Sequence, residues 1–284
     1  GAAIFPHLID SSAASQLTAQ SSTLTPYFSV QIPPLMDVMT ALVIAFMFGL
    51  GLAYLKGDRL REASYELREV VVMTIDKVVI PLLPLFIFCI FYNMAASGEV
   101  FRVMSVFVKI IAVIFVLHVL WLVALYVVAG VTAGKNPFKM LKTMLPAYFT
   151  ALGTQSSAAT IPVTLAQAKK MGVRDEVAGF VIPLCATIHL SGSMLKIVAC
   201  ALALMMMQGL EYDFAQIAGF IFMLGITMVA APGVPGGAIM AALGVLTSML
   251  GFSPADQALM ISLYIAMDSF CTACNVTGDG ALAM

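Results

Sequence analysis

Long apolar stretches separated by short polar connections dominate the chain. An apolar run of about 20 residues is long enough to cross a bilayer as a helix, at about 1.5 Å per residue. Uninterrupted or nearly uninterrupted runs of this kind predict transmembrane helices at 36–55, 70–96 and 101–131. Residues 1–35 are instead rich in Ser, Thr, Gln and Pro, and we expect them to form a polar extramembrane loop.

Two later segments are interrupted in a way that one helix does not explain. The segment 149–172 is broken by a Ser/Thr cluster and Pro162, and the segment 217–251 is broken by APGVPGG. We expect each to be a re-entrant helical hairpin, in which two half-spans meet at a polar tip. A broken span, 177–208, follows the first hairpin, and a polar one, 258–284, follows the second. Corresponding breaks in two halves point to a transporter binding site.

The pattern divides the chain into three parts. After the loop 1–35, residues 36–148 are expected to hold transmembrane scaffold helices and their connections, including a basic loop at 134–148. Residues 149–284 form the expected core transport domain, made of the two hairpins and the two spans that follow them. Because the chain begins without Met or an apolar signal sequence, we expect further helices to precede residue 1.

Composition identifies an all-α polytopic membrane protein. The 284 residues are 61% hydrophobic and 10% charged, with a mean hydropathy of +1.02, whereas soluble domains are about 45–50% apolar and about 25% charged. The net charge of −1 offers no basic stripe for nucleic acid. Five cysteines scattered in apolar segments do not indicate a disulfide framework. The expected location is the plasma membrane, or the inner membrane in a bacterium.

Basic residues support a two-gate topology. If the connection at 56–69 is cytoplasmic and each hairpin returns to its own side, most of the fourteen Lys and Arg residues face the cytoplasm. This asymmetry matches the positive-inside rule. It opens the first hairpin to the cytoplasm and the second to the outside.

Polar side chains recur along the last span. Asp268, Thr272, Asn275 and Asp279 follow one another at spacings of four, three and four, which places them on one helical face. A charge at membrane depth costs at least about 2.5–3.5 kcal/mol. The face is therefore either a binding surface for a polar solute or ion, or a buried network between helices.

Further polar residues mark the breaks. Ser156, Ser157 and Thr160 supply hydroxyls at the first tip, where free N–H groups attract a carboxylate. His189 is a proton relay, a metal ligand or a hydrogen-bonded core residue. The CxxC pair at 271 and 274 favours close helix packing over redox chemistry.

Four motifs together resemble the dicarboxylate/amino acid:cation symporter family, also called the glutamate transporter family. They are QSSAATIPVT (155–164), PLCATIHLSGS (183–193), APGVPGGAIM (231–240) and DSFCTACNVTGD (268–279). The likeness extends over essentially the whole chain. It implies an elevator-type glutamate transporter fold and a homotrimer, with a transport domain that moves against a scaffold in each protomer.

The resemblance also implies a substrate site. Ser157, Asn275 and the backbone around 234–236 would hold the main carboxylate of an amino acid. Asp268 would bind its ammonium group, with Thr272 nearby. The expected substrate-binding residues are Ser156, Ser157, Thr160, Val234, Pro235, Gly236, Asp268, Cys271, Thr272 and Asn275.

Two departures from the family pattern change the expected substrate and coupling ion. Members that carry acidic substrates usually have Arg where this chain has Cys271, so we expect a small neutral amino acid. The family's Asn-Met-Asp-Gly-Thr motif reads His-Leu-Ser-Gly-Ser here, and Lys196 follows one turn later. We expect Lys196, with His189, to replace the charge of at least one sodium ion and to pair with Asp279.

Sodium coupling would then be weakened or replaced by protons. Residues expected to bind or replace the cation are Cys185, Thr187, His189, Ser191, Lys196, Asn275 and Asp279. No cofactor is expected beyond Na⁺ or H⁺ as coupling ion, and no metal beyond Na⁺. The partners are the amino acid or dicarboxylate substrate and the lipid bilayer, without nucleic acid.

The sequence thus predicts a cation-coupled secondary active symporter of small amino acids, not an enzyme. Symport of dicarboxylates or acidic amino acids and uncoupled exchange are the alternatives within transport. A distant alternative is an intramembrane hydrolase built on Ser191, Ser193, Lys196 and His189.

Overall fold

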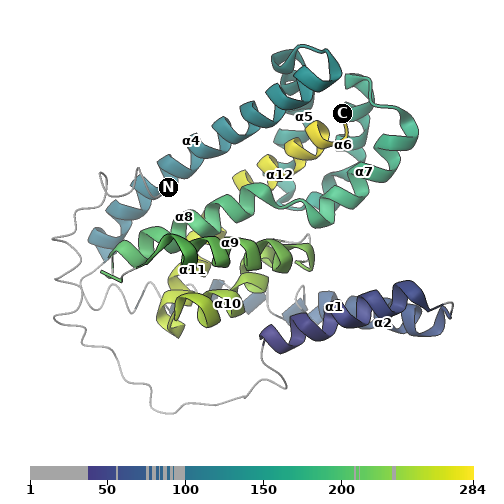
Figure 1. The fold of residues 1–284 in the computed structure, drawn as a ribbon. Coiled ribbons are helices and arrows are strands. Elements are labelled where there is room, and N and C mark those ends of the chain that lie inside the picture. The colour runs from purple at the N-terminus through teal and green to yellow at the C-terminus, as the bar shows by residue number, and fades with distance from the viewer. Residues whose placement is uncertain are drawn as a thin grey trace.

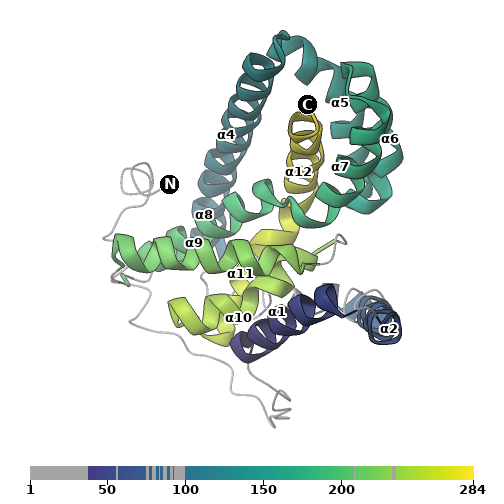
Figure 2. The same cartoon turned by 45° about the vertical axis from the view of Figure 1, so that its right-hand side comes forward.

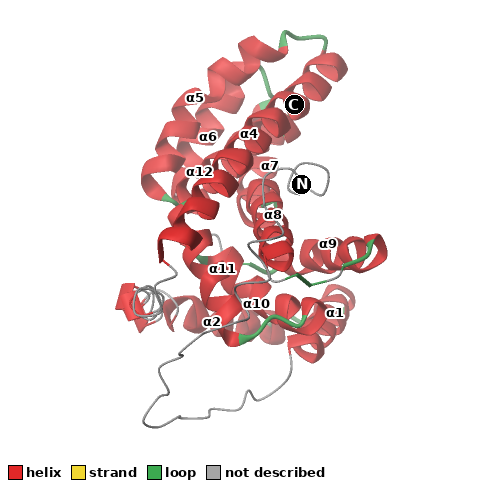
Figure 3. Cartoon of the chain, turned by 90° about the vertical axis from the view of Figure 1, so that its left-hand side faces the viewer, coloured by secondary structure: helices red, strands yellow, loops and turns green. Residues whose placement is uncertain are grey.

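The described part of the chain is helical throughout. The computed structural model describes residues 38–55, 57–74, isolated positions between 77 and 92, and 100–284 except for 208, 211 and 232–234; these contain no strand (Figure 3). The helices are α1 (Val38–Tyr54), α2 (Arg59–Thr74), α4 (Val100–Ala133), α5 (Pro137–Thr154), α6 (Ser157–Met171), α7 (Asp175–Ile188), α8 (Ser191–Met207), α9 (Phe214–Val229), α10 (Gly237–Leu250), α11 (Pro254–Ala266) and α12 (Asp268–Leu282). The expected polar loop 1–35, Val234 and much of the span 70–96 lie outside the described residues.

Two lobes make up the body of the molecule. The first lobe consists of α5, α6, α7 and α12, which share one buried apolar cluster. The second lobe consists of α8, α9, α10 and α11, which share another. Figures 1 and 2 show α4 running along both lobes, and its side chains enter both clusters. Each lobe therefore combines one helical hairpin with half of each broken span. In the same views α1 lies at the edge of the second lobe, against α10.

Local capping explains the first hairpin. Asn136 accepts hydrogen bonds from the N–H groups of Phe138 and Lys139 at 3.0 and 3.1 Å, and Pro137 fixes the first turn of α5. The prediction of a basic loop at 134–148 is therefore wrong from Pro137 onward, where α5 begins. Its lysines, Lys139 and Lys142, are exposed on the surface of a helix. The arms α5 and α6 pack on each other, and Gln155 joins them with a φ of 52°.

Both later spans are broken. The break expected in 177–208 is confirmed, since α7 ends at Ile188 and α8 begins at Ser191. The span 258–284, expected as one helix, is bent by 64° between α11 and α12. The ammonium group of Lys196, from α8, binds the carbonyl oxygen of Tyr264 at this bend. A side chain inserted at a helix carbonyl is a recognised cause of a kink.

Helix length supports a membrane protein. Among the described residues, Val108–Ala133 and the α7–α8 pair, Asp175–Met207, are long and apolar enough to cross a bilayer. The bent pair α11–α12 is a third such segment if it counts as one span. The hairpin arms α9 and α10 are shorter apolar helices, and α1, expected as a full span, has 17 residues.

Candidate functional site

The two hairpin tips meet at the first turn of α12. We define the first tip as Gln155–Ser156 and the second tip as the described residues between α9 and α10, which are 230, 231, 235 and 236. The side-chain amide of Gln155 donates to the hydroxyl oxygen of Ser269 at 2.8 Å. The N–H of Gly236 donates to Oδ2 of Asp268 at 2.7 Å. Because residues 268 and 269 are adjacent, the tips of hairpins from different lobes converge on one turn of one helix.

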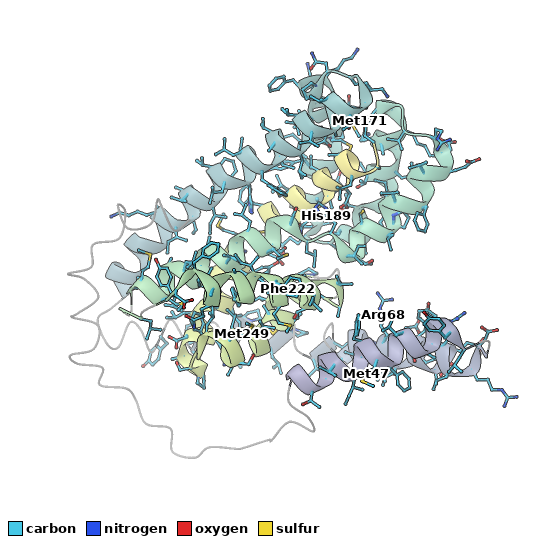
Figure 4. All side chains as sticks on the ribbon, viewed as in Figure 1. Met47, Arg68, Met171, His189, Phe222 and Met249 are labelled. Atoms are coloured by element: carbon cyan, nitrogen blue, oxygen red, sulfur yellow. The ribbon has the colours of Figure 1, made fainter. Side chains whose placement is uncertain are left out.

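The break between α7 and α8 faces the middle of α12. Oδ1 of Asn275 accepts the N–H of Gly192 at 2.7 Å, and its Nδ2 donates to the hydroxyl of Ser193 at 3.0 Å. Nδ1 of His189 lies 2.8 Å from Oδ1 of Asp279, whose side chain is 1% exposed. Figure 4 places His189 at the junction of α7 and α8, beside α12. The prediction of a polar face on α12 is confirmed. Three of its four residues contact backbone or side chains where one helix ends and the next begins.

Small residues permit this approach. A Cβ added to Gly192 would lie 2.8 Å from the Cβ of Cys274 and 3.0 Å from the carbonyl oxygen of Cys271. Both cysteines are free and fully buried. Their position in the contact between α8 and α12 agrees with the packing interpretation of the CxxC pair.

Lys196 does not pair with Asp279. Its side chain is fully buried, and its ammonium group donates to the carbonyl oxygen of Tyr264 and lies 3.7 Å from the centroid of the Tyr264 ring. The predicted pair is therefore wrong, because Lys196 points toward α11 while His189, at the break, occupies the carboxylate of Asp279.

Three residues of α4 escaped the sequence analysis. Nε2 of His118 lies 2.9 Å from the carbonyl oxygen of Gly192, the indole N–H of Trp121 donates to the hydroxyl of Ser191 at 3.1 Å, and the hydroxyl of Tyr126 donates to the carbonyl oxygen of Thr277 at 2.7 Å. A carbonyl oxygen only accepts, so Nε2 of His118 carries the proton. These three side chains in the otherwise apolar stretch 110–131 were the available signal.

The remaining expected residues serve mainly local structure. Ser156 caps α6 by accepting the N–H of Ala159 at 3.2 Å, and Thr160 donates to the carbonyl oxygen of Ser156 at 2.8 Å. Thr187 donates to the carbonyl oxygen of Leu184 within α7. Ser157, Cys185 and Thr272 are buried, and Pro235 lies half-buried beside Gly236.

Comparison of the sequence with known families gives a match over nearly the whole chain. The model of the Sodium:dicarboxylate symporter family matches residues 2–284. The chain belongs to this family. The predicted resemblance is thereby confirmed, and the family consists of membrane symporters of amino acids or dicarboxylates. Membership of a transporter family argues against the alternative hypothesis of an intramembrane hydrolase.

Relatives carry names for two substrate classes. The chain is 27% identical to an "Excitatory amino acid transporter" of Caenorhabditis elegans over 96% of this chain and 56% of the relative. It is 33% identical to "Excitatory amino acid transporter 2" of Homo sapiens over 52% of this chain and 26% of the relative. It is 29% identical to "Neutral amino acid transporter B(0)" of Rattus norvegicus over 51% and 26%. The chain spans about half the length of the worm relative, and these names leave the substrate class open.

Proposed function

We propose that the chain is the transport part of a cation-coupled symporter of small neutral amino acids. The observation that carries this proposal is the convergence of both hairpin tips on Asp268 and Ser269. A solute held at this turn of α12 touches both hairpins at once, which is what a two-gate transporter needs. The expected setting is a homotrimer in the plasma membrane, or the inner membrane of a bacterium, in which residues 149–284 move against a scaffold.

Asp268 and Gly236 together suit the two ends of an amino acid. Asp268 is 4% exposed, and its carboxylate accepts the N–H of Gly236. A substrate ammonium group is a stronger, charge-assisted donor and competes for the same carboxylate. Its arrival frees the N–H of Gly236, at the start of α10, for the carboxylate of the substrate. Substrate binding and a rearrangement of the second tip are then one event.

The neutral substrate class follows from Cys271. Acidic substrates need a donor for a second carboxylate, and Cys271 offers a buried thiol in place of a guanidinium group. Lys196 binds the backbone of α11 instead of presenting a fork of donors. The names of the relatives include neutral amino acid transport, which is compatible with this assignment.

Sodium coupling is expected to be weak, because oxygens suited to Na⁺ already have other partners. Asp279 is bound to His189, and Oδ1 of Asn275 accepts the N–H of Gly192. His189 and Ser191 also stand where the resemblance implies an amide and a carboxylate. Sodium prefers oxygen ligands and is repelled by a neighbouring positive charge such as the ammonium group of Lys196.

Counterflow in proteoliposomes with the intact transporter tests both assignments. We expect alanine and serine to exchange at rates at least about tenfold above those of aspartate and succinate. Removing the sodium gradient should slow uptake only a few-fold. A preference for aspartate would contradict the substrate class, a full sodium requirement would contradict the coupling, and exchange that no ion gradient drives would indicate an uncoupled exchanger.

A further inference from the structure

The buried ammonium group of Lys196 has no ion-pair partner among the residues that the structure describes. Its relative exposure is 0%. Ion pairs in the described part of the chain are Arg61–Asp58, Lys169–Asp175 and His189–Asp279, and none includes Lys196. An isolated ammonium group is expensive to bury, so something in its surroundings must balance the charge.

Part of that balance comes from the end of α11. The carbonyl oxygen of Tyr264 lies in the last turn of α11, where the helix dipole is negative, and it accepts a hydrogen bond from Lys196. The face of the Tyr264 ring adds a cation–π contact, with the nitrogen 3.7 Å from the ring centroid. These are partial charges and supply no full counter-charge.

The acidic residue that follows this contact most closely along the chain is Asp268, four positions after Tyr264. The bend of 64° lies between Tyr264, whose carbonyl oxygen binds Lys196, and Asp268, the first residue of α12. Asp268 is 4% exposed and lies one helical turn beyond the carbonyl oxygen that holds Lys196, and the ion pairs of the described residues do not join the two side chains. The carboxylate of Asp268 itself accepts a hydrogen bond from the N–H of Gly236.

We infer that Lys196 is a built-in counter-charge for Asp268, which makes a bound cation unnecessary at this turn of α12. This inference rests on the proposed function and deepens it. Lys196 is a positioning residue here, because it acts on the substrate through Asp268 and the bend.

A charge count gives the consequence for the substrate. Lys196 and Asp268 cancel, and a neutral amino acid is a zwitterion that adds no net charge, so its binding leaves this buried turn neutral. An aspartate or glutamate molecule adds one negative charge and requires a further cation. The inference therefore predicts that a neutral amino acid binds with one cation fewer than an acidic one.

The cation dependence of binding tests the inference directly. The apparent affinity of the intact, purified transporter for alanine is measured against Na⁺ concentration, with choline as the inert replacement. The slope of log affinity against log Na⁺ counts the cations taken up with the substrate. In Lys196→Met we expect the slope to rise by about one, with affinity lowered at least tenfold in choline and partly restored at high Na⁺. Lys196→Arg keeps the charge and should keep the wild-type slope.

An equal loss of affinity at every Na⁺ concentration, with an unchanged slope, would mean a merely structural lysine and would overturn the inference. The wild-type protein supplies a second comparison, because its slope for aspartate should exceed that for alanine by about one. Equal slopes would speak against the charge count.

Thermal unfolding without substrate tests the same pair independently of transport. Removing Lys196 alone leaves the charge of Asp268 buried and uncompensated, so the double variant Lys196→Met with Asp268→Asn should melt above Lys196→Met. The matched control combines Lys196→Met with Asp279→Asn, and its effects should add, because Asp279 is bound to His189. Additivity in both pairs would refute the counter-charge. If the wild type binds no amino acid, the proposed function fails, and this cycle still decides the inference.

Discussion

The tips of the two hairpins are built in different ways. At the first tip only Gln155 and Ser156 separate α5 from α6, and Ser156 caps α6 with its own side chain. At the second tip residues 230–236 separate α9 from α10, and Gly236, with a φ of 72°, provides no side-chain cap. The cap comes from another helix, since Asp268 accepts the N–H of Gly236.

This difference assigns the two tips different roles. At the first tip Ser156 caps α6, and the side chain of Gln155 donates a hydrogen bond to Ser269 of α12. The second tip depends on the same carboxylate that we propose for the substrate ammonium group. A ligand that binds Asp268 must therefore change the second tip, while it can leave the first unchanged. We therefore expect the second tip to respond to the ligand more strongly than the first.

Substitution of Asp268 should have the largest effect and should distinguish the roles of the two tips. Asp268→Asn removes the charge but keeps an oxygen for Gly236, whereas Asp268→Ala removes both. We expect both variants to lose alanine uptake by at least about 30-fold, since a buried charge pair contributes about 2–5 kcal/mol or more. Amide hydrogen exchange should rise at 230–240 in Asp268→Ala alone, and exchange at 150–160 should not change. Mass spectrometry of these peptides measures both.

The control for this pair is Glu176→Gln, which removes an exposed carboxylate from the first turn of α7. It should leave uptake and exchange at both tips unchanged. The two tips would not differ in role if Asp268→Asn took up alanine at the wild-type rate. The same conclusion would follow if amide hydrogen exchange changed equally at both tips.

A smaller effect is expected where the lobes meet. Gly192→Ala pushes a Cβ against Cys274 and the Cys271 carbonyl oxygen, at 2.8 and 3.0 Å. Overpacking of this kind costs about 1–3 kcal/mol, and the strain falls on the helix that receives both tips. Gly179→Ala is the matched control, because a Cβ at this position in α7 meets nothing within 4 Å. Thermal unfolding in nanodiscs should rank Gly192→Ala clearly below both the wild type and Gly179→Ala. Equal melting temperatures for the two variants would mean that α8 and α12 can separate freely.

Sequence reasoning found the breaks that local chemistry marks. The tips of the hairpins and the break at 189–190 lie at or beside Gly, Pro, Ser or Thr clusters, which disfavour a continuous helix. The break expected at Pro162 is wrong, because this proline lies inside α6. The bend at Met267 has no such marker. It accompanies a bond from Lys196, 68 positions away along the chain. A tertiary contact of this range leaves no trace in a local pattern.

The partners of polar residues were harder to predict than their faces. Spacing placed Asp268, Asn275 and Asp279 on one face of a helix, and all three bind there. Periodicity does not say which residue of the neighbouring helix lies opposite, and so Lys196 was assigned to Asp279. The contacts of His118 were missed for the same reason. The start of α5 was missed although Asn136 and Pro137 form a recognisable cap, because the lysines that follow resemble a loop.

The smallest expected effect lies at the first tip. Gln155→Leu keeps the size of the side chain but removes the hydrogen bond of 2.8 Å to Ser269. A hydrogen bond of this kind contributes about 0.5–1.5 kcal/mol, so we expect uptake to fall only about two- to tenfold. Gln216→Leu, which removes a bond to the carbonyl oxygen of Met249 far from either tip, should have no effect on uptake. If the first tip is self-supporting, exchange at 150–160 in Gln155→Leu remains near the wild-type value even though its link to α12 is gone. Strongly raised exchange there would show that the first tip also depends on α12, and that both tips are gates of the same kind.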